Sequence, residues 1–181
     1  MILSANILAL LCRQYGHEVS NSLFYAALQS WAEMRGFDGT AGYMAKQAAG
    51  ERTHADLVLG YIHDWNEQLY YSAFDIPTDQ PASFVDLFTL AQARERATTD
   101  MIAAIKAQAD SEGDMLTQAW LMQPSGLAME QLEEERTIQS ILDRISARRG
   151  MVYLDASEGV DMAEMPGNVI HDIDCWIKGL A

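Results

Sequence analysis

Long stretches of the chain repeat their apolar residues at steps of three and four, which keeps side chains on one face of an α-helix. Four such stretches are present, at about residues 4–34, 41–69, 84–111 and 114–149. Alternating apolar and polar residues, the mark of a half-buried strand, are almost absent. The pattern therefore predicts an all-α protein built on four long helices, with Ser4 as a candidate N-cap of the first.

Turn and breaker residues separate these stretches. Gly36 and Gly39 provide stop and turn signals between the first and second helices. A polar and aromatic segment at 70–82 contains Pro77 and Pro81 and shows no periodicity, so we interpret it as a long connection. The segment Pro124-Ser125-Gly126 interrupts the fourth stretch, and a proline there should bend or break the helix.

The order of helices and connections predicts a four-helix bundle with a long crossover between the second and third helices. A short turn makes antiparallel neighbours, and a connection of about a dozen residues can cross the length of a bundle. A short amphipathic helix is expected at 169–177. We assign residues 1–149 to the bundle and 150–181 to a tail of the same domain, since 181 residues suit one domain.

Charge narrows the range of partners. The chain has 26 acidic against 12 basic residues and a formal net charge of -14. This balance argues against nucleic acid and anionic membrane surfaces as partners, and it suits a protein that attracts cations, although many soluble proteins are simply acidic. The two cysteines show no metal-binding or disulfide spacing, and the apolar N-terminus lacks the features of a signal peptide. We therefore expect a cytoplasmic protein.

Each predicted helix places a carboxylate on its core-facing stripe, near the middle of its length. These stripes carry Glu18 on the first helix, Glu51 and His54 on the second, Glu95 on the third and Glu134 on the fourth. Buried carboxylates cost several kcal/mol each unless they are paired with positive charge. No Lys or Arg lies on these stripes, so the cluster needs cations. Oxygen-rich ligation with one imidazole favours iron or manganese.

The spacing of Glu51 and His54 places both side chains on one face, one turn apart, where both can reach one ion. A lone ExxH motif is a weak signal, because it often marks a solvated pair. Four inward carboxylates on four helices, with the crossover in the right place, are a much stronger joint signal. The alternative is that the stripes are wrongly drawn and these glutamates lie on the surface.

At these residues the sequence resembles the ferritin family, over roughly residues 14–158. The matching pieces are Glu18 with Tyr25, Glu51-Arg52-Thr53-His54, Glu95 in AQARERATTD, the run Glu130-Gln131-Leu132-Glu133-Glu134-Glu135 and the tail segment MVYLDASEG. The resemblance implies a diiron ferroxidase centre that oxidises Fe(II) with O2 or H2O2. It also implies a homo-oligomer, a 24-subunit shell that stores the ferric product.

The resemblance also implies roles for individual residues. Glu18, Glu51 and His54 would hold one iron ion. Glu51, Glu95 and Glu134 would hold the other, with Glu51 bridging. Gln131 would sit beside the second iron, and Tyr25 would lie next to the centre, where it could give an electron or a hydrogen bond.

The likeness is to the non-haem bacterial type. Haem-binding bacterioferritins carry a methionine directly after the second-helix Glu, where this chain has Arg52, so no haem is expected. The non-haem proteins often have a third iron site built from four glutamates. Glu130, Glu133 and Glu134 match three of these, but Gly50 occupies the fourth place and weakens the site. The Pro124-Ser125-Gly126 segment also departs from the family's continuous helix.

Three rival functions share parts of this pattern. A rubrerythrin-like diiron peroxidase would bring a second ExxH motif and a cysteine pair. An iron-loading protein that works inside a separate shell would be shorter. A non-catalytic helical scaffold would bind metal only for stability, or not at all. Among other residues, His17 is expected at the surface or an interface, because it lies about 100° around the helix from Glu18. Asp110, Glu112 and Asp114 form either a pore lining or a solvated turn with Asp114 as N-cap.

Overall fold

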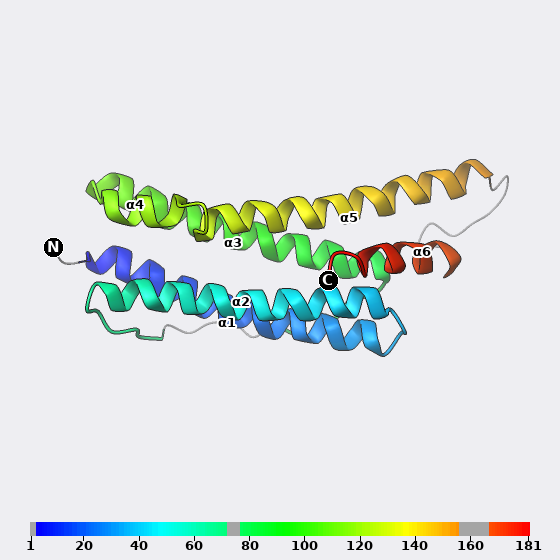
Figure 1. The fold of residues 1–181 in the computed structure, drawn as a ribbon, viewed down its shortest axis with the longest axis horizontal. Helices are drawn as coiled ribbons and strands as arrows, with labels where there is room; N and C mark the ends of the chain where they lie inside the picture. The colour runs from blue at the N-terminus through cyan, green and yellow to red at the C-terminus, as the bar shows by residue number, and fades with distance from the viewer. Residues whose placement is uncertain (1–2, 72–76, 156–166) are drawn as a thin grey trace.

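The structure is a computed structural model that describes residues 3–71, 77–155 and 167–181, with side chains described up to 148 in the second range. The described residues form helices and no strand, which confirms the all-α prediction (Figure 1). The helices are α1 (Ala5–Glu33), α2 (Asp38–Asp64), α3 (Phe84–Glu112), α4 (Met115–Met122), α5 (Leu127–Asp155) and α6 (Gly167–Ile177). Among the described residues, no helix combines the length and apolar character needed to cross a membrane.

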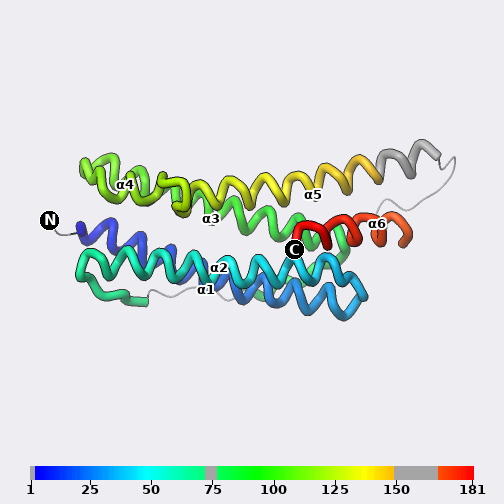
Figure 2. Tube along the Cα trace, viewed as in Figure 1, coloured from blue at the N-terminus to red at the C-terminus, as the bar shows by residue number. Residues whose placement is uncertain are grey.

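The helices form two antiparallel pairs packed along a common axis. Helices α1 and α2 make one pair, while α3 pairs with α4 and α5 (Figures 1 and 2). Helix α2 ends at the opposite end of the bundle from the start of α3, so their connection has to cross the length of the bundle (Figure 1). The predicted crossover arrangement is therefore confirmed.

Side-chain caps begin three of the helices. Ser4 accepts a hydrogen bond of 3.1 Å from the backbone N–H of Ile7, and Ser83 does the same for Asp86 at 3.1 Å. Asp114 accepts one of 3.0 Å from Thr117 as the cap of α4, which confirms its role at this turn. These short polar side chains satisfy N–H groups that a helix leaves unpaired at its start.

Helix α2 ends earlier than the sequence predicts, at Asp64 rather than near Leu69. The chain turns at Asn66, which adopts a left-handed φ of 56°. The backbone N–H of Glu67 then bonds the carbonyl of Ile62 at 3.2 Å and closes the helix. Asparagine tolerates this conformation better than most residues, so it can end a helix where glycine usually would.

The fourth predicted helix is broken at Pro124 into α4 and α5. The break changes which face of α4 is buried. Steps of three and four back from Gln131 would place Gln123 and Leu116 on the core stripe, yet both are exposed, while Thr117 and Leu121 are buried instead. The stripe was wrong there because helical phase does not carry through an interruption in the helix.

Apolar side chains fill the bundle on both sides of a polar middle. One cluster includes Tyr25, Phe88 and Ile141, and the other includes Leu11, Ile62 and Ile105. Burial of this apolar surface, at about 25 cal/mol per Å², is the main force that holds the helices together. The rigid packing on both sides positions the polar groups between the clusters.

Helix α6 folds back onto the start of α2. Asp174 accepts hydrogen bonds from the backbone N–H groups of Gly39 and Thr40, at 3.0 and 2.7 Å, and from the Thr40 hydroxyl at 2.7 Å. A Cβ on Gly39 would lie 2.0 Å from the Asp174 carbonyl oxygen, so this close approach requires glycine. Asp174 therefore caps α2, whose own N-cap residue makes no side-chain cap bond.

Candidate metal centre

The carboxylates singled out from the sequence converge in the polar middle of the bundle. They are Glu18 on α1, Glu51 and His54 on α2, Glu95 on α3 and Glu134 on α5. Glu18 and Glu95 are fully buried, Glu51 is 1% exposed and the Glu134 side chain is 17% exposed. Single ligand atoms of Glu18, Glu51 and His54 all lie within 4.8 Å of one another. These three side chains can therefore reach a common ion.

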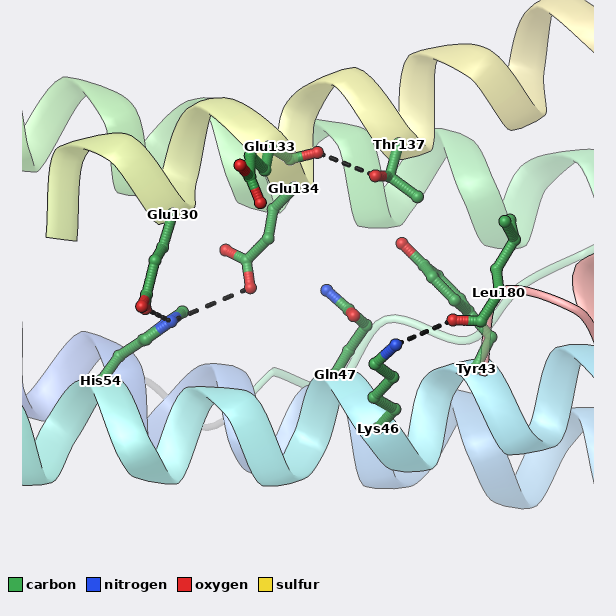
Figure 3. Close-up of a pocket in the computed structure, with 9 residues that line it drawn as sticks. All are labelled: Tyr43, Lys46, Gln47, His54, Glu130, Glu133, Glu134, Thr137 and Leu180. Carbon is green, nitrogen blue, oxygen red and sulfur yellow. Dashed lines mark hydrogen bonds and ion pairs between the residues drawn. The ribbon is translucent and has the colours of Figure 1, made fainter. Parts of the chain in front are cut away.

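His54 lies between the carboxylates of two helices. Its Nδ1 atom is 3.5 Å from Oε2 of Glu51, on its own helix. Its Nε2 atom faces α5, at 2.9 Å from Oε2 of Glu130 and 4.0 Å from Oε1 of Glu134 (Figure 3). Nδ1 of the imidazole thus points toward the candidate centre, and Nε2 contacts Glu130.

Three buried atoms of this cluster have no hydrogen-bond partner. They are Oε1 of Glu51, Nδ1 of His54 and Oε2 of Glu134. A buried polar atom left unpaired costs about 1–3 kcal/mol, and more when it is charged. Cations bound between α2 and α5 would give all three atoms a partner. The donor set of carboxylates with one imidazole therefore fits a metal ion, and it suits iron.

Burial makes these carboxyl groups weaker acids than exposed glutamate side chains. The pKa of Glu51 is raised to about 8, first by burial and then by the charges of Glu95 and Glu134, against hydrogen bonds that lower it. Burial and the charge of Glu95 likewise raise the pKa of Glu134 to about 8. The pKa of Glu18 is raised well above its usual value, again mainly by burial. Without a cation the cluster therefore retains protons near neutral pH, and a metal ion has to displace them.

Tyr25 and Gln131 both contact Glu95. The Tyr25 hydroxyl donates to Oε1 of Glu95, and burial raises the pKa of this phenol well above its usual value, so it stays protonated. The Gln131 amide donates to Oε2 of Glu95 at 2.8 Å and to its backbone carbonyl at 3.1 Å. The structure thus places both predicted residues around the carboxylate of α3, where their hydrogen bonds orient it.

A pocket of about 380 Å³ opens beside the centre, between α2 and α5 (Figure 3). His54, Glu130, Glu133 and Glu134 line it on the side of the centre. A Cβ on Gly50 would meet only Oε1 of Glu134, at 3.9 Å, so this glycine leaves open space. The three glutamates of the predicted third site therefore share one pocket, without a fourth carboxylate at Gly50.

The helical stripes did not identify Arg94 as a positively charged side chain next to the centre. Arg94 on α3 is half-buried and reaches α1, where its Nε donates to Oδ1 of Asn21 at 2.5 Å. A second nitrogen donates to the Ser20 hydroxyl at 2.6 Å. Arg94 does not lie on the buried stripe itself, but a long side chain can extend from a neighbouring position and keep its charged end near the core. Its position next to Glu95 was the available signal.

His17, expected at the surface or an interface, is instead partly buried. Its Nε2 atom lies 2.9 Å from the Thr98 hydroxyl. Burial lowers the pKa of His17 to about 4, and the charge of Arg94 adds to this shift. The imidazole is therefore neutral at physiological pH and belongs to the packed contact between α1 and α3.

Comparison with known proteins places the chain among iron proteins of similar length. The model of the ferritin-like domain matches residues 8–148. The "Probable bacterial non-heme ferritin-like protein" of Haemophilus influenzae is 27% identical over 145 residues, which cover 80% of this chain and 86% of that protein. A "Bacterial non-heme ferritin" of Bacteroides fragilis is 28% identical over 148 residues, covering 81% and 91%. One from Escherichia coli O157:H7 is 25% identical over 158 residues, covering 85% and 94%.

Proposed function

Because the chain belongs to the ferritin family, we propose that it is an iron-storage subunit that binds two Fe(II) ions per chain and oxidises them. The observation that carries this proposal is the set of three unpartnered buried atoms, on Glu51, His54 and Glu134. Packing alone leaves these atoms without partners, whereas a pair of bound metal ions would give each atom a partner. The curated relatives named as bacterial non-heme ferritins support the same reading.

The proposed binding sites share one carboxylate. Glu18, Glu51 and His54 hold the first ion, in keeping with the short separation of their ligand atoms. Glu51, Glu95 and Glu134 hold the second ion, so Glu51 bridges the two. Tyr25 and Gln131 keep Glu95 in position through their hydrogen bonds, and the Tyr25 phenol, whose single O–H is donated to Glu95, lies where it could give an electron during oxygen reduction.

The proposed reaction removes one electron from each bound Fe(II). Two Fe(II) ions, one O2 and two protons give two Fe(III) ions and one H2O2. A further pair of Fe(II) ions, with two more protons, reduces H2O2 to two water molecules. Negatively charged oxygen ligands bind Fe(III) more strongly than Fe(II), so the carboxylates favour oxidation.

Further features of the proposal follow from the family. We place the oxidised iron in an oligomeric shell of 24 subunits and the protein in the cytoplasm, where its two free cysteines would stay reduced. Haem has no part in the proposal, since Arg52 follows Glu51. Glu130, Glu133 and Glu134 form a weak third iron site, because Gly50 adds no carboxylate and Glu130 is engaged by His54.

The ferroxidase proposal is favoured over a rubrerythrin-like peroxidase. The fourth-helix motif has Glu134 where such an enzyme would bring a second histidine, and Cys12 and Cys175 lie on different helices. The non-catalytic scaffold is the remaining alternative. It predicts the same fold and the same buried carboxylates, but no Fe(II)-dependent consumption of oxygen.

Stopped-flow absorbance tests the proposal. Fe(II) is added anaerobically to the metal-free protein at about two ions per chain, and oxygen is then admitted. A fast rise that saturates near two irons per chain, and that disappears in Glu51→Ala, would support the ferroxidase centre. Asp56→Ala is the matched control, because Asp56 is an exposed carboxylate on the same helix, and it should leave the rise intact. A wild-type rate no faster than that of protein-free solution would overturn the proposal.

A further inference from the structure

A connected set of polar side chains joins α1 to α3 directly beside Glu18. Asn21 is fully buried at its centre. Its side-chain oxygen accepts the 2.5 Å hydrogen bond from Arg94, while its side-chain nitrogen donates to the Thr98 hydroxyl at 3.1 Å. The same nitrogen faces Oε2 of Glu18 at the longer distance of 3.5 Å. Asn21 is thus placed between a cation and a candidate metal ligand.

Arg94 decides which way the Asn21 amide faces. A guanidinium group only donates hydrogen bonds, so the atom of Asn21 that it contacts has to be the oxygen. The amide nitrogen, with its partial positive charge, is thereby turned toward Glu18. If the amide were reversed, its oxygen would face a carboxylate oxygen, which is repulsive, and Arg94 would face N–H groups.

The Thr98 hydroxyl supports the same orientation. It donates its own proton to the backbone carbonyl of Arg94 at 3.2 Å. Its oxygen is then left to accept, from Asn21 on one side and from Nε2 of His17 at 2.9 Å on the other. Because both partners must donate to this oxygen, the contact fixes the Asn21 nitrogen on the side of Thr98 and Glu18.

Glu18 is consequently held from behind through both of its oxygens. The Gln14 amide donates to Oε1 at 2.6 Å, and the Asn21 amide faces Oε2. These donors come from the same helix, one turn on either side of Glu18, and the Asn21 side chain also interacts with the Glu51 carboxylate. A ligand restrained in this way loses less conformational freedom when a metal ion binds.

We infer that Arg94 is a positioning residue, which acts through Asn21 to hold Glu18 ready for the first metal ion. This inference rests on the proposed function. It assigns the tighter metal position to the group formed with Glu51 and His54, because the network restrains Glu18, which is a proposed ligand of that group alone. The inference assigns this role to the forked shape of the Arg94 side chain and not to its charge alone, because only a guanidinium group can donate to both Asn21 and Ser20.

Titration with Co(II) tests the inference without relying on oxidation. Binding heats and the visible absorption of Co(II) report each metal position separately. Arg94→Lys keeps the positive charge but cannot make both contacts, and Asn21→Leu removes the amide while keeping a side chain of similar branched shape. Each should weaken the tighter position by about tenfold to a hundredfold, the range typical of residues that orient a metal ligand. Each should leave the weaker position within about twofold.

The double variant tests whether Arg94 acts through Asn21. If it does, Asn21→Leu combined with Arg94→Lys should bind Co(II) no more weakly than Asn21→Leu alone. Losses that multiply would overturn the inference, because they would show that Arg94 acts independently of the amide. Thermal unfolding of every variant is measured alongside, and a general loosening of the bundle would weaken both positions equally and also overturn it.

Arg52→Lys is the matched control. Arg52 also donates to a serine of α1, at 2.9 Å from the Ser22 hydroxyl, but Ser22 passes its own proton to the backbone carbonyl of Ala48 and not to a candidate ligand. This variant should leave both Co(II) positions unchanged. If wild type binds two Co(II) ions and Arg94→Lys matches it, the inference fails while the metal centre stands. If wild type binds none, the proposed function fails with it.

Discussion

The Nε2 atom of His54 lies 2.9 Å from a carboxylate oxygen of Glu130, on the opposite side of the bundle. When a neutral imidazole donates its Nε2–H to a carboxylate, its Nδ1 is left as an unprotonated acceptor. In this protein Nδ1 is the nitrogen that is buried without a partner beside Glu51. If His54 binds a metal ion through Nδ1, as proposed, Glu130 would set both the orientation and the tautomer that this binding requires.

Removal of the Glu130 carboxylate should weaken metal binding at His54. Glu130→Ala is expected to lower the Co(II) affinity of that position by about tenfold to a hundredfold, whereas Glu130→Gln retains an acceptor oxygen and should stay within a few-fold of wild type. Calorimetric titration measures both. Glu133→Ala serves as control, because Glu133 lines the same pocket but makes no contact with His54 in the structure. An unchanged affinity in Glu130→Ala would contradict this role.

Addition of a carboxylate at Gly50 should strengthen the proposed third iron site. Gly50→Glu has room for its side chain, because a Cβ there meets only Glu134, at 3.9 Å. Together with Glu130, Glu133 and Glu134 it would complete the set of four glutamates expected for this site. We expect the number of tightly bound Fe(III) ions to rise from two to three per chain, as measured by elemental analysis after removal of loose iron.

The control for this change is Gly60→Glu. Gly60 also lies on α2, is exposed and has open space around its Cα, so it adds the same charge away from the pocket. It should leave the iron count at the wild-type value. An equal rise in both variants would mean that added charge, and not the completed site, binds the extra iron.

The stability of the metal-free protein should fall as pH rises from about 5 to about 8. Glu51 and Glu134 have pKa values near 8 in the folded protein, against about 4.5 when exposed. Because the folded state then binds more protons than the unfolded state, each unit of pH within this window favours unfolding. Calorimetry should show Tm decreasing by several degrees. Glu134→Gln, which lacks one of these groups, should show a smaller decrease, and bound Co(II) should abolish it.

Loss of the Asp174 carboxylate should release α6 from α2. Asp174→Ala removes three buried hydrogen bonds and leaves the Gly39 and Thr40 N–H groups without partners. The cost of a lost helix cap is about 0.5–2 kcal/mol, which corresponds to a fall in Tm of a few degrees for a chain of this size. Limited proteolysis should cut the tail faster. Asp172→Ala, at an exposed position of α6, should change neither result.

Much of the fold and part of the centre could be predicted because they depend on local geometry. The helical period placed Glu18, Glu51, His54 and Glu95 on inward stripes, and all four are buried. Ser4 was expected as a cap and acts as one, because capping depends on neighbouring backbone groups. Prediction failed where the helix itself is interrupted. The apolar stripe of α5, extended by helical spacing through the break at Pro124, placed the wrong face of α4 in the core.

The sequence by itself therefore determined four inward-facing helical stripes with carboxylates at their centres, since helical spacing needs only near neighbours. The tertiary structure alone decided that Arg94 turns the Asn21 amide, 73 residues away, and that Asp174 caps a helix 134 residues earlier. Such contacts depend on which side chains the packed helices bring together and on where their flexible ends point. No periodicity in the chain encodes that, because it is set by the packing of distant segments against one another.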